Sequence, residues 1–320
     1  MGSESGRGAV VALGCFDGVH AGHRALLLAA KAAAAERGLS FTVWSLTGKP
    51  GKGGAASRLL CSEAARERLL REEIGADRVI LAPFCAVHAL APEKFVREIL
   101  QAQLHAAFAV CGENFRFGKG GAGDASVLRA LMQAQGGDAF VLPLLRESAL
   151  RSVEPMPGSP IPVDPVVSST RIRALLEAGD PAAAALLLGR PFFIEGEVCR
   201  GKALGRTLGF PTANLRFPDA LVRPKRGVYF GRVTLQDGAR YAAVCNLGMR
   251  PTVEDGYGLL LECCLLDFSG SLYGQQIRAE LLHFLRPERR FASREELQAQ
   301  VLADLETGKE LAAKMTHHHF

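Results

Sequence analysis

The sequence predicts an α/β domain followed by a small antiparallel β-barrel. Over residues 9–188, short apolar runs alternate with segments of helical pattern, which is typical of a mostly parallel sheet covered by helices. Beyond residue 189 there are closely spaced runs rich in Val, Tyr, Phe and Leu, separated by Gly, Pro and Asp, as in antiparallel barrels. A chain of 320 residues accommodates two cores. We therefore expect one domain over 1–188 and a second over 189–320.

In the first half, apolar runs predict strands and the intervening segments predict helices. The strands are expected at 9–13, 41–46, 78–81 and 108–111, and the helices at 24–37, 62–74, 92–104 and 125–135. The first helix ends before Gly38, a residue suited to a helix C-terminus. Because ligands of such sheets bind at the carboxyl ends of strands, the turn after the first strand is the first candidate site.

The second half predicts five strands and a closing helix. The strands are expected at 192–199, 227–235, 241–247, 258–267 and 275–284. Ser293 and Glu296 form a helix-capping box, and Leu297, Val301 and Leu305 then recur every four residues, as in an amphipathic helix. Between the predicted elements, the proline-rich stretch 155–165 indicates a surface arm, and the Gly/Lys-rich stretch 48–54 a mobile connection.

The composition is that of an ordinary globular protein, with 48% hydrophobic and 22% charged residues. The net charge of +5 suits polyphosphate substrates, but no run of Lys and Arg resembles a nucleic-acid patch. Four Tyr and one Trp also offer few surfaces for base stacking. We expect small-molecule partners and no nucleic acid, and the oligomeric state stays open.

The cysteines and the first residues indicate a cytoplasmic protein. The eight Cys include no Cys-x-x-Cys pair and mostly lie in apolar runs, which favours buried reduced thiols over disulfides or a zinc site. The opening MGSESGRG has no signal-peptide core, and no apolar run reaches the length of a membrane span. We interpret the three histidines at 317–319 as an exposed tail rather than a metal site.

The turn after the first strand, GCFDGVHAGH, has the composition of a phosphate-binding site. Gly14, Gly18 and Gly22 allow a ligand to approach the backbone, and the following helix N-terminus offers free N–H groups. His20 and His23 are three residues apart and can face the same phosphate. A His-x-x-His pair is often accidental, but its place in a Gly-rich turn between strand and helix favours function.

Two later segments support this site. SSTRIR at 168–173 opens a helix. Its Ser and Thr are ordinary caps, but two arginines in the first turn oppose the helix dipole and are best tolerated beside an anion. GENFRFG at 112–118 follows a strand, and Asn114 can bridge ligand groups there. Phe115 and Phe117 are equally well explained as core residues.

In this order, the three motifs resemble the adenylyltransferase half of bacterial bifunctional riboflavin kinase/FAD synthetases, an HxGH nucleotidyltransferase with a Rossmann-like sheet. The resemblance implies that the FMN phosphate attacks the α-phosphorus of ATP in line, without a covalent enzyme intermediate. The catalytic residues that it implies are His20, His23, Asn114 and Arg173. The further ATP-binding residues are Gly14, Phe16, Asp17, Gly22, Ser169, Thr170 and Arg171.

One stretch departs from that family. Its members usually carry T-F-x-P-h-P after the second strand, whereas residues 45–50 are SLTGKP and keep only Pro50. Cys15 also stands where Asn or Ser is commoner. Because the ATP-binding motifs are intact, we expect FAD synthesis with a weak apparent affinity for FMN.

The second candidate site lies at 205–214, GRTLGFPTAN. Gly209 and Pro211 exclude a plain strand over the whole segment. Thr212 and Asn214 point the same way if their part is extended, and their oxygens suit Mg²⁺ bound with phosphates. On spacing alone, a turn with side-chain-to-backbone hydrogen bonds is the better explanation.

Glu262 lies in the apolar run LLLECCLL at 259–266. A carboxylate in such a strand costs free energy unless it is paired or functional. The alternative is a solvent-facing residue on an edge strand. The run alone leaves both interpretations open.

The whole C-terminal part resembles riboflavin kinase, which implies a six-stranded Greek-key barrel. The motifs GRTLGFPTAN, GVY at 227–229, NLGMRPT at 246–252, LYG at 272–274 and LRPE at 285–288 occur in the family's order. The resemblance implies that Thr212 and Asn214 hold Mg-ATP and that Glu262 is the general base for the ribityl hydroxyl. It also implies phosphate contacts for Gly201, Lys202, Gly205 and Arg206, and flavin contacts for Arg286 and Phe291.

We therefore expect a bifunctional enzyme that phosphorylates riboflavin to FMN and adenylylates FMN to FAD with release of pyrophosphate. ATP is the co-substrate, and Mg²⁺ serves both sites. One alternative is a working riboflavin kinase whose nucleotidyltransferase half is weak or altered, as the stretch at 45–50 suggests. The other is a non-enzymatic flavin- or nucleotide-sensing protein, against which the intact histidine pair and Glu262 argue.

Overall fold

The computed structural model describes residues 8–48, 58–150, 164–199, 212–252 and 256–315. The chain divides into two compact units, Met1–Ser169 and Thr170–Phe320. This division lies before the expected domain boundary at 188/189, because α6 (Ser169–Ala178) and α7 (Pro181–Leu188) belong mainly to the second unit. The Lys225 N–H of that unit donates to the Leu176 carbonyl of α6 at 3.0 Å.

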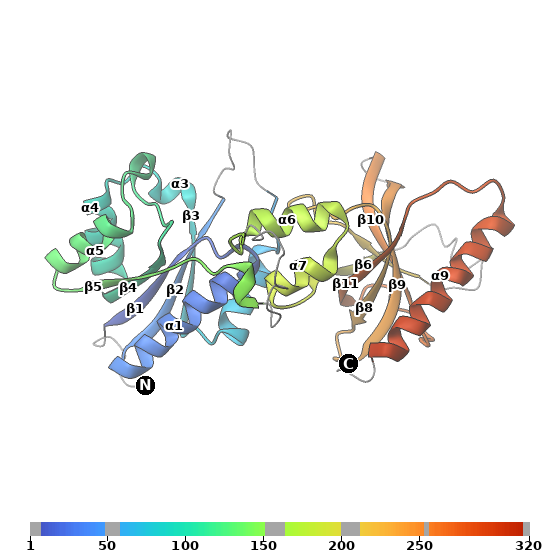
Figure 1. The fold of residues 1–320 in the computed structure, drawn as a ribbon, viewed down its shortest axis with the longest axis horizontal. Helices are drawn as coiled ribbons and strands as arrows, with labels where there is room; N and C mark the ends of the chain where they lie inside the picture. Colours follow the sequence, from blue (N-terminus) through green and yellow to red (C-terminus); the bar gives the residue numbers. More distant parts are fainter. Residues whose placement is uncertain (1–7, 49–57, 151–163, 200–211, 253–255, 316–320) are drawn as a thin grey trace, which may run out of the picture. The chain divides into compact units, whose positions relative to one another are not determined.

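The first unit is built on a five-stranded parallel sheet in the order β3-β2-β1-β4-β5 (Figure 1). Its strands are β1 (Ala9–Gly14), β2 (Ser40–Thr47), β3 (Arg78–Pro83), β4 (Ala106–Gly112) and β5 (Asp138–Leu142). The first four confirm the strands predicted from the sequence. The fifth is absent from that prediction because DAFVL is a short edge strand with only one fully buried residue.

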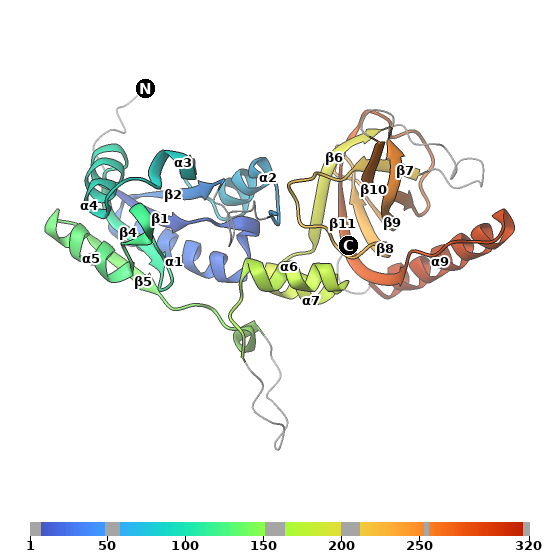
Figure 2. The same cartoon turned by 90° about the horizontal axis from the view of Figure 1, so that it is seen from above.

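Helices confirm the predicted α/β class. The central strand β1 is buried on both faces, since its residues 10–13 are at most 1% exposed, and Figure 2 shows α1 on one side of the sheet and α4 on the other. The predicted helix 62–74 consists of α2 and η3, and the predicted helix 92–104 of α4 and η4. The elements are α1 (Ala21–Arg37), α2 (Glu63–Arg68), η3 (Leu69–Glu73), α3 (Phe84–Val87), α4 (Pro92–Lys94), η4 (Phe95–Gln103), α5 (Ala125–Ala134) and the short turns η1 (Asp17–Val19), η5 (Lys119–Gly121) and η6 (Glu147–Leu150).

The strand order places a crevice beside β1. From β1 the chain proceeds outward to β2 and β3, then returns to β4 on the other side of β1. Ligands of such sheets bind where the order reverses, outside the carboxyl ends of the strands. The turn after β1 therefore lies where a ligand is expected.

The second unit contains a closed six-stranded antiparallel barrel, which confirms the predicted architecture, and its strands follow the order β10-β7-β6-β11-β8-β9. Its strands are β6 (Phe192–Cys199), β7 (Thr212–Arg216), β8 (Gly227–Thr234), β9 (Arg240–Thr252), β10 (Gly256–Leu265) and β11 (Gln276–Pro287). Thr212 and Asn214 lie in β7, so the end of the GRTLGFPTAN motif is extended. α7 packs against β6 and β11.

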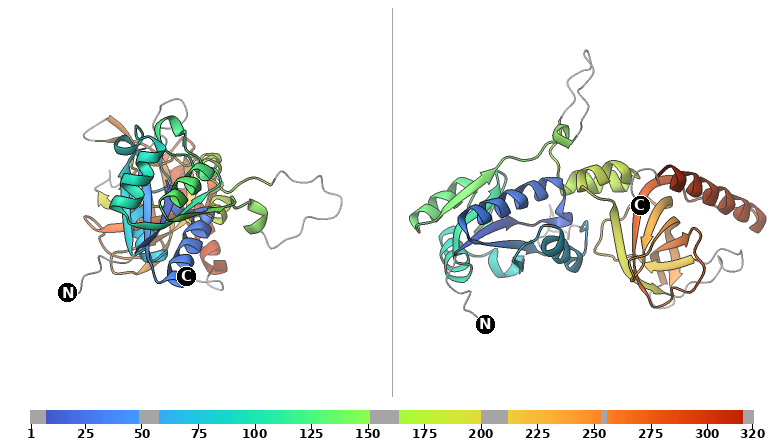
Figure 3. Two further views of the ribbon diagram at one scale, coloured as in Figure 1. Left: turned by 90° about the vertical axis from the view of Figure 1, so that its left-hand side faces the viewer. Right: turned by 90° about the horizontal axis from the view of Figure 1, so that it is seen from below.

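The closing helix α9 (Arg294–Met315) lies beside β8 and β9 (Figure 3). Its capping box is formed: the Glu296 N–H donates to Ser293 Oγ at 3.1 Å, and Glu296 Oε2 accepts from the Ala292 N–H at 2.9 Å. The apolar face of the helix is anchored by Leu305. It is buried in a cluster with Val228, Val244 and Leu266.

All eight cysteines are free thiols, but the prediction that they are buried is correct only for Cys61, Cys111, Cys245 and Cys263. Within the described part of the chain, no helix is long and apolar enough to cross a membrane. Most of the stretches 48–54 and 155–165, and the histidines at 317–319, lie outside the described residues.

Candidate active sites

The turn after β1 holds a strained backbone at the carboxyl edge of the sheet. Phe16 and Val19 adopt left-handed conformations, with φ of 47° and 41°. Such conformations cost free energy in non-glycine residues and persist only where the surroundings enforce them. Gly14 is required by close approach, because a Cβ there would lie 2.8 Å from the Phe16 ring. The turn is thus fixed before α1 begins.

Two histidines stack at the start of α1. The ring centroids of His20 and His23 are 3.5 Å apart, and the planes differ by 18°. His20 is buried, and its Nδ1 accepts the backbone N–H of His23 at 3.3 Å. In the neutral ring of His20 the proton must therefore be on Nε2, which makes that nitrogen a donor.

Burial and charge keep His23 neutral. Its pKa lies well below the usual value, first because burial disfavours the charged form, and then because of positive charge on His20 and Arg66. The edge of the ring also meets Phe16 at a centroid distance of 5.3 Å. His23 Nδ1 makes no hydrogen bond within the described residues. Near pH 7, His23 is thus a neutral hydrogen-bonding group rather than a fixed cation.

Both histidines line a cavity of about 750 Å³, a size suited to a nucleotide-sized ligand. Its polar lining includes Gly14, His20, Gly22, His23, His88, Asn114, Arg116, Ser168 and Ser169. Its aromatic lining includes Trp44, Phe95, Phe117 and Phe115, whose rings contact one another in that order at 5.4, 5.3 and 5.7 Å. The cavity therefore offers donors to phosphates and flat apolar surface to a ring system.

The other predicted residues of this site are divided between the units. Phe16 lines the cavity, but Asp17 does not: its carboxylate accepts the Leu60 N–H at 2.8 Å, and its carbonyl accepts Ser169 Oγ–H at 3.1 Å. Asp17 thus fixes the turn to two distant segments. Beyond Ser169 the chain continues on α6 in the second unit, with Thr170, Arg171 and Arg173.

In the barrel, Glu262 lies between two asparagines on neighbouring strands. On β10 it pairs in register with Asn214 of β7 and with Asn246 of β9. Asn246 Nδ2 donates to Glu262 Oε2 at 3.3 Å. Glu262 is half-buried on an internal strand of a closed barrel, so the edge-strand alternative is excluded.

Asn214 lies beside this carboxylate on the neighbouring strand β7. It is buried, and its Nδ2 makes a long hydrogen bond of 3.5 Å to the Thr212 carbonyl. The described residues contain no group of three or more His, Cys, Asp or Glu that could hold a metal ion. The side-chain oxygens of Thr212 and Asn214 fit Mg²⁺, which keeps water and phosphate ligands and needs few protein oxygens.

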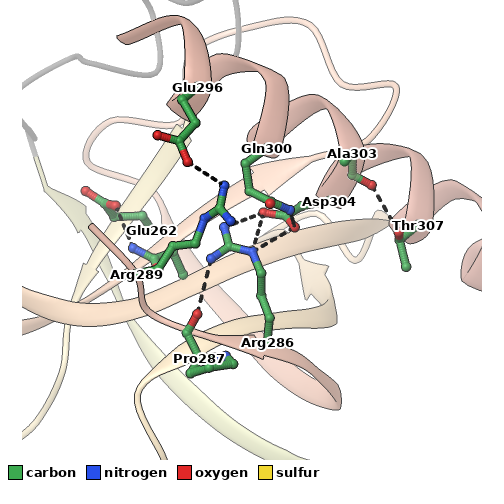
Figure 4. A network of polar contacts seen from close by, with 10 residues as sticks. Glu262, Arg286, Pro287, Arg289, Glu296, Gln300, Ala303, Asp304 and Thr307 are labelled. Atoms are coloured by element: carbon green, nitrogen blue, oxygen red, sulfur yellow. Dashed lines mark hydrogen bonds and ion pairs between the residues drawn. The ribbon is translucent and has the colours of Figure 1, made fainter. Parts of the chain in front are cut away.

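Arg286 is held by α9 (Figure 4). Its Nε donates to both carboxylate oxygens of Asp304, at 2.9 and 3.1 Å, and its Nη2 donates at 2.6 Å. Gln300 also donates to Asp304 at 2.9 Å. The Phe291 ring lies near two guanidinium groups, 5.9 Å from that of Arg286 and 4.6 Å from that of Arg289.

Four predicted phosphate-contacting residues, Gly201, Lys202, Gly205 and Arg206, lie outside the described residues. Three further residues were not predicted from the sequence. Asn246 contacts Glu262, Asp304 contacts Arg286, and Arg66 is buried on α2. A polar residue inside a barrel strand was a usable signal for Asn246. The partners of Asp304 and Arg66 depend on tertiary packing and left no local pattern.

Comparison with known proteins associates each half with a family. The family model described as FAD synthetase matches residues 3–151, and the one described as riboflavin kinase matches residues 188–312. Together these matches cover most of the chain. The candidate sites around His20 and Glu262 fall in different matches.

Curated relatives cover nearly the whole chain. The bifunctional riboflavin kinase/FMN adenylyltransferase of Haemophilus influenzae is 35% identical, with 95% of this chain and 94% of the relative covered. The proteins of the same description from Escherichia coli K12 and Bacillus subtilis are 36% and 32% identical, covering 95% and 92% of this chain and 92% and 90% of theirs. A crystal structure described as a macrolide-efflux protein from Streptococcus pneumoniae has a TM-score of 0.79 at 29% identity, covering 97% of this chain and 95% of that one.

Proposed function

This chain belongs to the bifunctional riboflavin kinase/FMN adenylyltransferases, and from that membership we propose how its residues divide the two reactions. Riboflavin and ATP give FMN and ADP in the barrel. FMN and a second ATP give FAD and pyrophosphate at the sheet edge of the first unit. The row of Asn214, Glu262 and Asn246 across three barrel strands supports the kinase assignment most directly.

In AMP transfer, a phosphate oxygen of FMN attacks the α-phosphorus of ATP as the bond to the β-phosphate breaks. The chain contributes positioning and charge stabilisation rather than a nucleophile. His20 donates from Nε2 and His23 acts as a neutral ring at the phosphates, with the free N–H groups at the start of α1. Asn114, Ser169, Thr170, Arg171 and Arg173 supply further phosphate contacts, as do the backbone positions Gly14, Phe16 and Gly22, whereas Asp17 supports the turn.

The aromatic lining of the same cavity supports a position for the isoalloxazine ring of FMN. Trp44, Phe95, Phe115 and Phe117 offer flat surfaces for an apolar ring. The FMN phosphate then extends toward the histidine pair. Leu46 of the altered SLTGKP stretch also lines the cavity, and Lys49 and Pro50 lie outside the described residues.

In the kinase reaction, the ribityl hydroxyl attacks the γ-phosphorus of ATP as the bond to the β-phosphate breaks and ADP leaves. Glu262 takes the hydroxyl proton, and Asn246 orients the carboxylate through its hydrogen bond. Arg286 and Phe291 border the flavin. Gly201, Lys202, Gly205 and Arg206 are proposed along the nucleotide phosphates.

We assign Mg²⁺ in the barrel to Thr212 and Asn214, whose side-chain oxygens are hard ligands on the same strand. When bound, the ion would screen the charge of the ATP phosphates. We also propose a cytoplasmic location, because all eight cysteines are free thiols.

A flavin product assay tests this division. The protein is incubated with ATP and Mg²⁺ and either riboflavin or FMN, and the flavins are separated by chromatography. Glu262→Gln should lower FMN formation by about 10²–10⁴-fold and leave FAD formation from supplied FMN intact. Glu197→Gln, an exposed carboxylate on β6, is the matched control. Near-normal FMN formation by the Glu262 variant would remove it from the mechanism.

A further inference from the structure

Arg66 is a cation buried in the first unit. It lies on α2 and its side chain is 2% exposed. The carboxylate paired with it, that of Glu63, is 3.6 Å away and 50% exposed. A buried charge with so little compensation costs free energy. A residue of this kind requires an explanation other than packing.

The guanidinium contacts the two strand ends that border the cavity. Arg66 Nη1 donates to the Cys15 carbonyl at 2.6 Å and to the Leu46 carbonyl at 3.3 Å. Cys15 directly follows β1, and Leu46 lies near the end of β2. Ser45 Oγ also donates to the Cys15 carbonyl, at 2.9 Å. The Cys15 carbonyl therefore accepts hydrogen bonds from both Arg66 and Ser45, immediately before Phe16, whose backbone is left-handed.

We propose that Arg66 is a positioning residue for AMP transfer, which holds the ends of β1 and β2 through Cys15 and Leu46 so that the strained turn keeps both histidines at the cavity. The role rests on the proposed function of that cavity. Its physical basis is the charged donor, since a hydrogen bond from an ionised group is about twice as strong as a neutral one. Arg66 itself does not line the cavity.

The same charge acts on His23. The groups that lower the pKa of His23 are the stacked His20, from the same turn, and Arg66, from α2. The other ionisable groups around the turn are engaged elsewhere. Asp17 accepts from the Leu60 N–H, and Arg24 pairs with Glu73 at 2.9 Å. Removal of the Arg66 charge should therefore make His23 easier to protonate.

Two substitutions separate geometry from charge. Arg66→Met removes both the hydrogen bonds and the charge, whereas Arg66→Lys keeps the charge and loses the planar donor. Arg71→Met, which alters an exposed ion pair on the adjoining η3, is the control. Riboflavin kinase turnover in the same full-length chain reports folding of the second unit, and fluorescence of the single Trp, Trp44, reports folding of the first.

Steady-state AMP transfer and an NMR titration of His23, assigned with a His23→Gln sample, are the two readouts. For Arg66→Met we expect kcat for FAD formation to fall at least about tenfold with kinase turnover unchanged, and His23 to titrate at a higher pH than in the wild-type protein. For Arg66→Lys we expect a smaller loss of kcat and an unchanged titration.

The titration needs no turnover, so it tests Arg66 separately from the proposed reaction. An unchanged His23 titration in Arg66→Met, or wild-type FAD formation by that variant, would overturn the proposal. If Arg66→Met does not fold, Arg66→Lys decides. Full AMP transfer by the lysine variant, or a His23 titration raised despite the retained charge, would then contradict it.

Discussion

Asn246 and Glu262 are cross-strand neighbours on β9 and β10, and the Asn246 amide donates to the Glu262 carboxylate at 3.3 Å. The pair links the proposed general base to a strand on the opposite side from Asn214. A carboxylate fixed in this way presents its remaining lone pairs in a defined direction. Orientation of a base is part of its catalytic value.

We predict that Asn246→Ala lowers kcat of the kinase by about tenfold with little change in KM for ATP, because the base is intact but less well oriented. Asn246→Asp should be worse, since an ionised second carboxylate repels Glu262 and cannot donate a hydrogen bond to it. Gln276→Ala removes an exposed carboxamide on β11 and is the control. Equal kcat for the Asn246→Ala and wild-type proteins would show that Glu262 needs no such partner.

A second prediction concerns Arg286 and Asp304. Their side chains are 20% and 8% exposed, so Asp304→Asn leaves a partly buried cation uncompensated. We expect this change to destabilise the second unit by about 3 kcal/mol and to raise KM for riboflavin, because Arg286 loses its anchor. Calorimetry and kinase kinetics measure the two effects.

The matched control for this pair is Asp219→Asn. It breaks an ion pair between the Asp219 side chain, which is 91% exposed, and the Arg223 side chain, which is 39% exposed. The free energy of unfolding should fall by less than about 1 kcal/mol. A destabilised second unit with an unchanged KM for riboflavin would separate Arg286 from flavin binding.

The lowered pKa of His23 leads us to predict that the stability of the first unit depends on pH. Its pKa is lowered in the folded protein, so below the unfolded value of about 6.5 the unfolded chain binds more protons. Stability is therefore complete above pH 6.5 and falls as the pH decreases toward the folded pKa, by at most about 1.4 kcal/mol per pH unit. Urea unfolding followed by Trp44 fluorescence at pH 7.5 and 5.5 measures this loss. His23→Gln should reduce it, and an identical loss in that variant would assign it to other groups.

The sequence was informative wherever local chemistry decides structure. Gly38 ends α1 and Ser293 caps α9 as predicted, since each needs only its own backbone neighbours. Five barrel strands were predictable from their apolar runs. β7 was not, because the residues before Thr212 include Gly209 and Pro211 and only two neighbouring strands make Thr212–Arg216 extended.

Within the candidate sites, the histidine pair was predictable from its spacing in the Gly-rich turn. Its protonation was not, because the lowered pKa of His23 depends first on burial, and then on the charges of His20 and of Arg66 on the distant α2. Asp17 was predicted beside ATP, but its carboxylate turns toward the Leu60 N–H. Tertiary hydrogen bonds of this kind have no local sequence pattern.

The altered stretch at 45–50 predicts weak binding of FMN by the first unit. Ser45 stands where the family usually has Thr. It is fully buried and its hydroxyl donates to the Cys15 carbonyl, so this position keeps a hydroxyl group that supports the turn after β1. The sequence that follows is rich in Gly and Lys, and fixing each such residue around a flavin costs roughly 1–2 kcal/mol of backbone entropy. We expect a high KM for FMN with an ordinary KM for ATP, measured by varying each substrate in turn. Saturation at low FMN would show that the change is harmless.

The last prediction concerns which fragment contains a complete kinase. The sequence places the boundary at 188/189, and we expect residues 189–320 to fold and phosphorylate riboflavin. However, α7 packs against β6 and β11, and its Ala184, Leu187 and Leu188 are at most 4% exposed. A fragment that begins at 189 exposes the barrel surface beneath them, and burial of one leucine contributes about 1.5–3 kcal/mol.

Residues 170–320 should therefore melt at a clearly higher temperature than residues 189–320, while both fragments turn over riboflavin. Leu186→Ser in the longer fragment is the control, because Leu186 lies on the same helix but is 63% exposed. It should leave the melting temperature nearly unchanged, whereas Leu187→Ser should lower it. Equal stability of the two fragments would mean that α7 adds nothing to the barrel, and an inert longer fragment would mean that kinase activity depends on the first unit.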